Sequence, residues 1–290
     1  MRNFFTRIFL LTLIAAAVTL HSPVNAEYMH LKMGNPSKAT SSASNKNNYL
    51  MQKPYFALSY NNAKGEPNWV SWRLVASDIG YAPRVTFYPD QDLPLGFNTV
   101  YPRDYTGSGF DRGHMCPHED RSANDDMSHA TFVMTNIIPQ SPNVNRKAWE
   151  QLEIYCRDLA KQGKTLYIIS GPAGTCGTGS KGSLSSMGMV GHVVVPAKCW
   201  KVIMVLDGGS GDDIRRVNAN TRLIAVIMPN DMSVGEDWAG FRVPVADVEK
   251  LTGFTFFGKV PTAIIGPLKK KADRTWIPAP RIRYRRNSGD

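Results

Sequence analysis

The side chains that could do chemistry gather between residues 105 and 157 of this 290-residue chain. His114 closes the run Asp-Arg-Gly-His, and Asn145 follows further along. Glu153 and Arg157 come next, four residues apart. A neutral histidine can take a proton from water near pH 7, amide and carboxylate oxygens suit a hard cation, and arginine binds phosphate. The set therefore predicts water activation beside a phosphate held by a metal ion.

Each of these residues also has a plainer interpretation. The Asp-Arg-Gly-His run could be an ordinary strand end, and Asn145 could be a helix cap. Arg112 could bind phosphate or brace the local backbone, and Asp111 could fix a neighbouring arginine or orient His114. Gly113 allows an unusual backbone geometry or close packing beside the histidine. The residue types alone leave both interpretations open.

A helix is predicted to carry the later half of this set. From Ala148 the apolar residues recur at three- and four-residue spacing, and Gly163 ends the pattern. These apolar residues are Trp149, Leu152, Cys156 and Leu159. Glu153 and Arg157 share a face away from this stripe.

The remaining elements predict an α+β fold, with an antiparallel sheet core flanked by helices. Runs rich in β-branched or apolar residues, bounded by turn residues, predict strands. They are 55–60, 69–74, 165–170, 192–195, 200–206 and 223–228. A short helix is expected over 247–251, and 79–102 reads as loop. No regular strand–helix repeat occurs, which favours an antiparallel sheet over a parallel one.

The ends of the chain differ from its middle in composition. Residues 1–26 have a basic start, a short apolar run and a small-x-small cleavage pattern, which predicts a signal peptide. An uncleaved anchor is the alternative, and no later stretch is apolar enough to span a bilayer. We expect 27–49 to be a disordered polar leader, 50–266 one domain and 267–290 a basic tail. The protein is thus expected to be exported, to the periplasm or beyond.

The formal net charge is +10, which favours anionic partners such as nucleic acid, anionic lipid or acidic polysaccharide. Part of the excess lies in the tail, which includes Lys269, Lys270 and Lys271 and several arginines. That tail is either a solvated extension or a weak phosphate-binding segment.

Four cysteines lie in the exported part, where disulfides can form. Three pairings are possible, and Cys176–Cys199 is favoured because a Gly-rich loop and a strand start carry them. Cys156 is expected to be a buried thiol. The absence of C-x-x-C argues against a structural zinc site.

Two further patterns resemble sites and are judged not to be. Residues 177–182 fit G-x-G-x-x-G, but no helix is predicted to open there, so a flexible surface loop is expected. His114 and His118 are four apart, but Pro117 between them disfavours a helical metal pair. His118, His129 and His192 are expected at the surface or at strand ends.

The stretch from Tyr105 to Arg157 resembles the DNA/RNA non-specific endonuclease family, the ββα-metal nucleases related to the Serratia nuclease. It is most similar to the cyanobacterial sugar-non-specific branch of that family. The resemblance covers residues 55–260. The matching text comprises 68–72, 105–114, 120–122, 134–140 and 145–153, with later matches at 155–157, 163–164, 171–172, 200–202 and 219–222. The family pattern implies a ββα finger that brings a histidine at a strand end opposite an asparagine on a helix.

The resemblance implies His114 as general base and Asn145 as the direct ligand of Mg²⁺ or Mn²⁺. It implies that Glu153 anchors metal-bound water and that Arg157 contacts the scissile phosphate. Asn136 would support the site by hydrogen bonding, and Arg112 lies inside the signature. The family also has an arginine upstream of the signature, for which Arg84 is the candidate, although its spacing to Pro89-Asp90 departs from the family pattern.

Residues and resemblance together predict an exported Mg²⁺- or Mn²⁺-dependent endonuclease. It would cut double- and single-stranded DNA and RNA without sequence specificity and leave 5′-phosphates, and a cognate inhibitor is a possible partner. One alternative is a phosphodiesterase for a small or lipid-linked substrate, which would have a closed apolar pocket. The other is a non-catalytic nucleic-acid-binding protein, which would bind DNA equally well without a metal ion.

Overall fold

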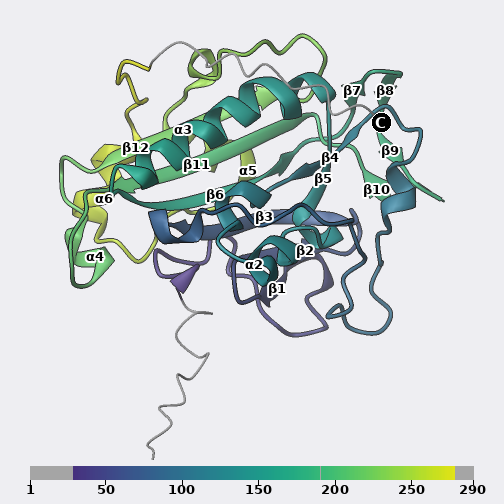
Figure 1. The fold of residues 1–290 in the computed structure, drawn as a ribbon, viewed down its shortest axis with the longest axis horizontal. Helices are drawn as coiled ribbons and strands as arrows, with labels where there is room; N and C mark the ends of the chain where they lie inside the picture. The colour runs from purple at the N-terminus through teal and green to yellow at the C-terminus, as the bar shows by residue number, and fades with distance from the viewer. Residues whose placement is uncertain (1–28, 190, 278–290) are drawn as a thin grey trace, which may run out of the picture.

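The computed structural model describes residues 29–189 and 191–277, which fold around a six-stranded antiparallel sheet (Figure 1). The strands lie in the order β1-β2-β3-β6-β11-β12. Their bounds are Tyr49–Gln52 (β1), Ala57–Asn61 (β2), Glu66–Leu74 (β3), Thr165–Ala173 (β6), Lys198–Leu206 (β11) and Arg222–Pro229 (β12). The predicted α+β class with an antiparallel core is confirmed. Strand β1 was not predicted, because it lies where the polar leader was expected to end.

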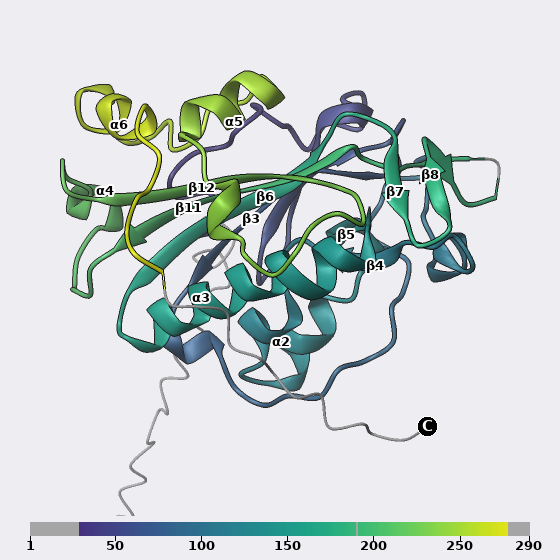
Figure 2. The ribbon, with the colours of Figure 1, turned by 90° about the horizontal axis from the view of Figure 1, so that it is seen from above.

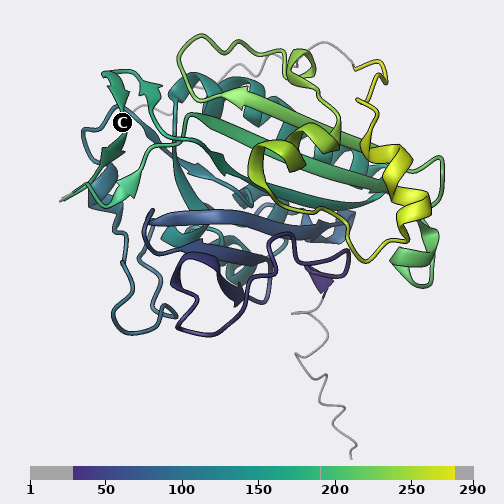
Figure 3. The same ribbon diagram turned by 180° about the vertical axis from the view of Figure 1, so that it is seen from behind.

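Helices cover both faces of the sheet (Figure 2). One face carries α2 (Asp125–Ala130) and α3 (Trp149–Lys161), and the other carries α5 (Val245–Thr252) and α6 (Thr262–Lys269). Figure 3 shows α5 and α6 lying across the sheet from behind. A further short helix, α4 (Asp213–Arg216), follows β11.

Alternating strand residues supply a separate hydrophobic core on each face, as the two-residue period of a strand requires. Ile168 and Ile203 pack in the core beneath Leu152 of α3. Their neighbours along the strands, Ile169 and Val202, belong to the core beneath α5 and α6. The predicted helix over 247–251 is confirmed as part of α5, and Gly253 ends it in the left-handed conformation.

A small two-stranded finger, whose second strand is buried against this body, carries the chemistry-bearing residues. Strand β4 (Asp111–His114) pairs antiparallel with β5 (Ile137–Gln140), and His114 lies opposite Ile137. A Cβ atom on Gly113 would lie 2.3 Å from Oε1 of Gln140, so only glycine allows this pairing. Beyond β5 the chain enters a π-helical segment, Val144–Ala148, which continues into α3. This is the predicted ββα arrangement.

The predicted disordered leader is wrong for residues 29–49, which pack against the domain. Leu31 and Met33 are buried in the core beneath α5 and α6. The Asn48 side-chain oxygen accepts hydrogen bonds from the hydroxyls of Ser37 and Ser59 at 2.6 and 2.8 Å. The polar residues of this segment bond to one another and to the sheet, which composition alone does not reveal.

The expected start of the basic tail, residue 267, is also too early. Residues 267–269 complete α6, and Asp273 accepts hydrogen bonds from Arg222 and Arg242. The segment up to 277 is therefore tied to the domain. The rest of the expected tail, like the expected signal peptide, lies outside the described residues.

The Gly-rich stretch at 177–182 forms a hairpin instead of the predicted flexible loop. Strands β7 (Gly177–Gly179) and β8 (Gly182–Leu184) pair there, and β9 (Ser186–Met187) pairs with β10 (Val193–Val194). Close approach explains one of the glycines, since a Cβ atom on Gly179 would lie 2.5 Å from the carbonyl oxygen of Gly109. No helix opens at this point, so the rejection of a dinucleotide site stands.

The favoured Cys176–Cys199 disulfide is wrong, because all four cysteines are free thiols. Cys199 lies on β11 and points into the core beneath α3, whereas Cys176 is exposed in a loop with φ of 77°. The strand pairing directs Cys199 inward, away from any loop cysteine. Cys156 is a buried thiol, as predicted.

Within 29–189 and 191–277, none of the helices combines the length and apolar character needed to cross a bilayer.

Candidate nuclease active site

The predicted catalytic residues line one cavity of about 370 Å³ between β4 and the helical segment that follows β5. Those that line it are Arg84, Arg112, His114, Asn145, Glu153 and Arg157. They come from the loop after β3, from β4 and from the helix, so the fold brings together segments more than seventy residues apart. Asn136 is the one predicted site residue that does not line the cavity.

His114 lies at the end of β4 and packs against two aromatic rings that also contact each other. Its ring centroid is 5.2 Å from that of Phe87 and 5.0 Å from that of Phe132. Its Nε2 atom is buried and has no hydrogen-bond partner among the described residues. Burial, together with the charges of Arg84 and His118, lowers the pKa of His114 to about 3. The imidazole is therefore neutral near pH 7.

Asn145 faces the finger from the π-helical segment. Its amide nitrogen donates to Oδ2 of Asp111 at 2.8 Å, which leaves the amide oxygen for another partner. Arg146 holds both oxygens of the same carboxylate, at 2.8 and 2.6 Å. Asp111 thus fixes an arginine, one of its two predicted roles. Asn145 does not act as a helix cap, since its side chain bonds across to β4.

Glu153 lies deeper in the cavity and is held by a lysine that was not predicted. Nζ of Lys201 lies 3.4 Å from Oε1 of Glu153 and 4.1 Å from the centroid of the Trp149 ring. Burial raises the pKa of Glu153 to about 7, and the charges of Lys201 and Arg157 oppose that rise. Lys201 is 1% exposed. The signal in the sequence was a charged residue inside the otherwise apolar run 200–206, but its contact with Glu153 depends on how that strand packs against α3.

Arg157 shares the helix face of Glu153, as predicted, and is anchored by two acids. Its Nη1 donates to Oδ1 of Asp120 at 3.1 Å, and its Nη2 forms an ion pair with Glu119. Asp120 is buried and also accepts a hydrogen bond from Nε1 of Trp72. A guanidinium has five N–H donors, so Arg157 keeps donors for a ligand in the cavity.

Two other predicted arginines line the cavity in different ways. Arg112 donates to the carbonyl of Pro102 at 3.2 and 2.7 Å, so it braces the backbone, one of its two predicted roles. Arg84 is exposed, and its guanidinium carbon lies 5.1 Å from the ring centroid of Phe132, beside His114. The structure thus brings Arg84 to the cavity despite its unusual spacing to Pro89-Asp90.

Asn136 and His118 lie around His114. The Asn136 side chain bonds both the backbone nitrogen and the carbonyl of Cys116, at 2.9 and 2.8 Å. It therefore fixes the chain just beyond His114. His118 was expected at the surface or at a strand end, but it is buried and lines the cavity, because a 3₁₀ turn over His118–Arg121 folds it inward.

The sequence and the fold of this chain are similar to those of known nucleases. Residues 33–263 match the family model described as DNA/RNA non-specific endonuclease. The chain belongs to this family. It is 45% identical to a nuclease of Nostoc over 246 residues, which are 84% of this chain and 86% of that protein. It is 34% identical to the human mitochondrial nuclease EXOG, across 69% of this chain and 55% of that one.

A solved structure agrees with the family assignment. The EndoG chain in a complex with EndoGI, described as showing the mechanism of EndoG inhibition, matches with a TM-score of 0.67 and 25% identity. The match covers 85% of this chain and 96% of that chain. It therefore extends over most of the chain.

The residues in the cavity of this family member fit a hard divalent cation. The Asn145 amide oxygen and the Glu153 carboxylate are the kind of donors that Mg²⁺ prefers. The described residues contain no cluster of three or more His, Cys, Asp or Glu side chains able to hold a metal ion. An ion here would thus have few protein ligands and keep several waters, as Mg²⁺ commonly does.

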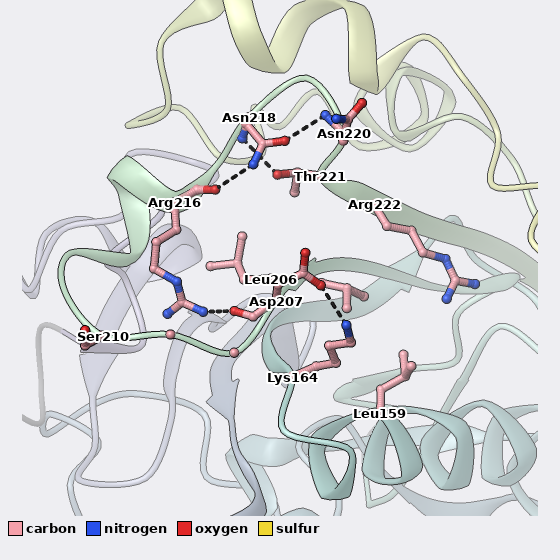
Figure 4. A pocket seen from close by; sticks show the side chains of 13 residues that line it. Leu159, Lys164, Leu206, Asp207, Ser210, Arg216, Asn218, Asn220, Thr221 and Arg222 are labelled. Carbon is pink, nitrogen blue, oxygen red and sulfur yellow. Dashed lines mark hydrogen bonds and ion pairs between the residues drawn. The ribbon is translucent and has the colours of Figure 1, made fainter.

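A second cavity, of about 430 Å³, lies at the far end of α3 and does not contribute to this site (Figure 4). Its basic residues are already neutralised within the nuclease. Lys164 pairs with Asp207 at 2.6 Å, and Arg222 bonds Asp273. Arg216 donates to the backbone of Asp207 and to Asp213. The candidate active site is therefore the smaller of these two cavities.

Proposed function

We propose that this protein is an exported endonuclease that hydrolyses phosphodiester bonds of DNA and RNA without sequence specificity, using Mg²⁺ or Mn²⁺. The main support is the cavity in which the neutral His114 imidazole and the Asn145 amide are accompanied by Arg84, Arg112 and Arg157. Such a set combines a base, an oxygen ligand and cations for phosphate at a single place.

The roles of the side chains follow from their surroundings. His114 accepts a proton from the attacking water, since it is neutral at the working pH. Arg157 and Arg84 stabilise the negative charge that develops on the phosphate oxygens. Asn145 would hold a bound cation directly, and Glu153 would hold it through water. When bound, the cation supplies Lewis-acid stabilisation and lowers the pKa of its water. The products end in 5′-phosphate.

The supporting residues set the geometry of the reacting groups. Asn136 fixes the backbone beyond His114, and Asp111 orients the Asn145 amide so that its oxygen is free. Arg112 braces the loop through the carbonyl of Pro102. These contacts hold the base and the cation ligand in place before substrate binds, which is what preorganised catalysis requires.

The two rival functions are less well supported. A phosphodiesterase for a small or lipid-linked substrate would need a closed apolar pocket, whereas this cavity is lined mainly by charged side chains. A non-catalytic binding protein would have no use for a neutral, aromatic-flanked histidine beside an oriented amide. The open, charged cavity favours an extended polyanion, double- or single-stranded.

The deciding experiment compares wild type with His114→Ala on supercoiled plasmid and ribosomal RNA. Each is assayed with Mg²⁺, with Mn²⁺ and with EDTA, and His129→Ala serves as the matched control because His129 lies outside the cavity. We expect cleavage of both substrates only with metal, and a loss of at least about 100-fold in His114→Ala alone. Equal DNA binding by both proteins without any cleavage would support the binding-protein alternative.

The proposal includes export and a protein inhibitor. The pattern of residues 1–26 supports cleavage before Glu27, which the intact mass of the exported protein would test. The solved relative in complex with EndoGI supports a cognate inhibitor for this chain as well. Such an inhibitor would protect the producing cell from a nuclease that escapes export, and co-purification before export would reveal it.

A further inference from the structure

A smaller cavity of about 300 Å³ adjoins the catalytic one and has no role in the chemistry described so far. His118, Glu119 and Arg157 line both cavities, so the two are adjacent. The residues found only on the far side include Tyr81 and Lys161. A strand whose phosphate lies at Arg157 would extend directly into this space.

Tyr81 is presented to solvent from an immobilised stretch of backbone. Tyr81 as a whole residue is 103% exposed. Its neighbours, however, are firmly held: the nitrogens of Gly80 and Ala82 donate to the hydroxyl and the carbonyl of Ser122, each at 2.9 Å. A Cβ atom on Gly80 would lie 2.5 Å from that same carbonyl, so the packing demands glycine. An aromatic ring fixed at its base and open on its faces is a stacking platform.

Lys161 adds a second positive charge to the smaller cavity. It comes four residues after Arg157 on α3, so the two cations lie on one helix face, one turn apart. Lys161 is exposed and lines the cavity. A phosphate at Arg157 and its neighbour near Lys161 would bring the base between them to the cavity that Tyr81 also lines.

We propose that Tyr81 and Lys161 form a nucleotide subsite beside the scissile phosphate, in which a base unstacked from the substrate strand packs on the Tyr81 ring. This inference rests on the proposed nuclease function and deepens it. It predicts that Tyr81 increases the rate of cleavage more for single-stranded substrates than for duplexes, since bases in a duplex are already stacked on each other. Stacking on an aromatic ring tolerates every base, so the subsite is compatible with sequence-independent cleavage.

The test measures kcat/KM of Tyr81→Ala, Tyr81→Phe and Leu95→Ala on a single-stranded oligonucleotide and on its duplex. Leu95 is the matched control, because it is equally exposed and lines neither cavity. Loss of one base–aromatic stack corresponds to a decrease of about 5- to 150-fold. We expect that decrease for Tyr81→Ala on the single strand and a smaller one on the duplex. Tyr81→Phe and Leu95→Ala should stay near wild type.

An abasic residue moved along the oligonucleotide separates stacking from damage to the loop. At one position next to the cut, removal of the base should slow wild type and leave Tyr81→Ala unchanged. If Tyr81→Ala is as fast as wild type, or slows equally on intact and abasic strands, the subsite is refuted while the nuclease function stands. If wild type itself does not cleave, the proposed function fails first.

Lys161 is tested by salt dependence of binding in the inactive His114→Ala background. Removing one phosphate contact should reduce the slope of log K against log salt by about 0.7 for a single strand. Lys161→Ala should show this change, and Lys270→Ala, an exposed lysine at the end of α6 on the opposite face of the sheet, should not. Equal slopes for both variants would remove Lys161 from the subsite.

Discussion

The buried ion pair between Asp120 and Arg157 allows the structural role of Arg157 to be separated from its proposed catalytic role. Asp120 is 1% exposed and Arg157 is 5% exposed. Breaking a buried pair by removing one partner costs about 3–5 kcal/mol, because the other charge remains buried. In Asp120→Asn, Arg157 keeps Glu119, whose side chain is 42% exposed, so we expect the lower end, about 3 kcal/mol. For a domain of this size that lowers Tm by about 6–12 °C.

Thermal unfolding and urea titration of Asp120→Asn and Arg157→Met measure this cost. The two variants should lose similar stability. Nuclease activity at 25 °C should differ, since Asp120 does not line the cavity and Arg157 does. We expect Asp120→Asn to stay within about tenfold of wild type and Arg157→Met to lose about 100- to 1,000-fold, the typical effect of one transition-state donor. Equal activity losses would show that Arg157 acts only through the pair, and a Tm shift below about 2 °C would refute the stability argument.

Three further predictions concern metal affinity, pH and thiols. Asn145→Ala should raise the Mg²⁺ concentration for half-maximal activity by at least about tenfold, as loss of a ligand or its support does; an unchanged metal titration would remove Asn145 from the ligand set. Burial raises the pKa of Glu66 to about 8. Between about pH 4.5 and 8 the folded protein therefore keeps a proton that the unfolded chain has already lost. Stability from this group therefore falls as pH rises. The urea midpoint of Glu66→Gln, relative to that of wild type, should rise between pH 5 and pH 9; a difference between the two midpoints that does not change with pH would contradict this. A thiol reagent should label only Cys176 in the native protein and all four cysteines in urea, because the other three are buried; two or more fast-reacting thiols would contradict the packing.

The sequence was most informative where a residue's chemistry and its spacing agree. The strand runs identified an antiparallel sheet, and the spacing of Glu153 and Arg157 put them on one face of α3. The resemblance supplied the pairing of His114 with Asn145. Both kinds of inference work because periodicity and signature motifs are local properties of the chain.

What could not be predicted depends on contacts between distant segments. Lys201 meets Glu153 only because β11 runs beneath α3, and His118 is buried because a 3₁₀ turn folds back onto the finger. The leader was misjudged for the same reason: its polar residues bond to partners on the sheet that composition does not reveal. The cysteine pairing failed because strand register, which a sequence alone does not show, directs Cys199 into the core.

The π-helical segment Val144–Ala148 makes the active site sensitive to insertion and deletion as well as to substitution. The Trp149 nitrogen bonds the Val144 carbonyl five residues back, so the turn that carries Asn145 holds one residue more than an α-helical turn would. Deleting a single residue there would restore regular α-helical bonding but rotate Asn145 by about 100° relative to Glu153. A relative that keeps both residues with one fewer between them could therefore look intact in an alignment and yet have lost the arrangement that faces His114.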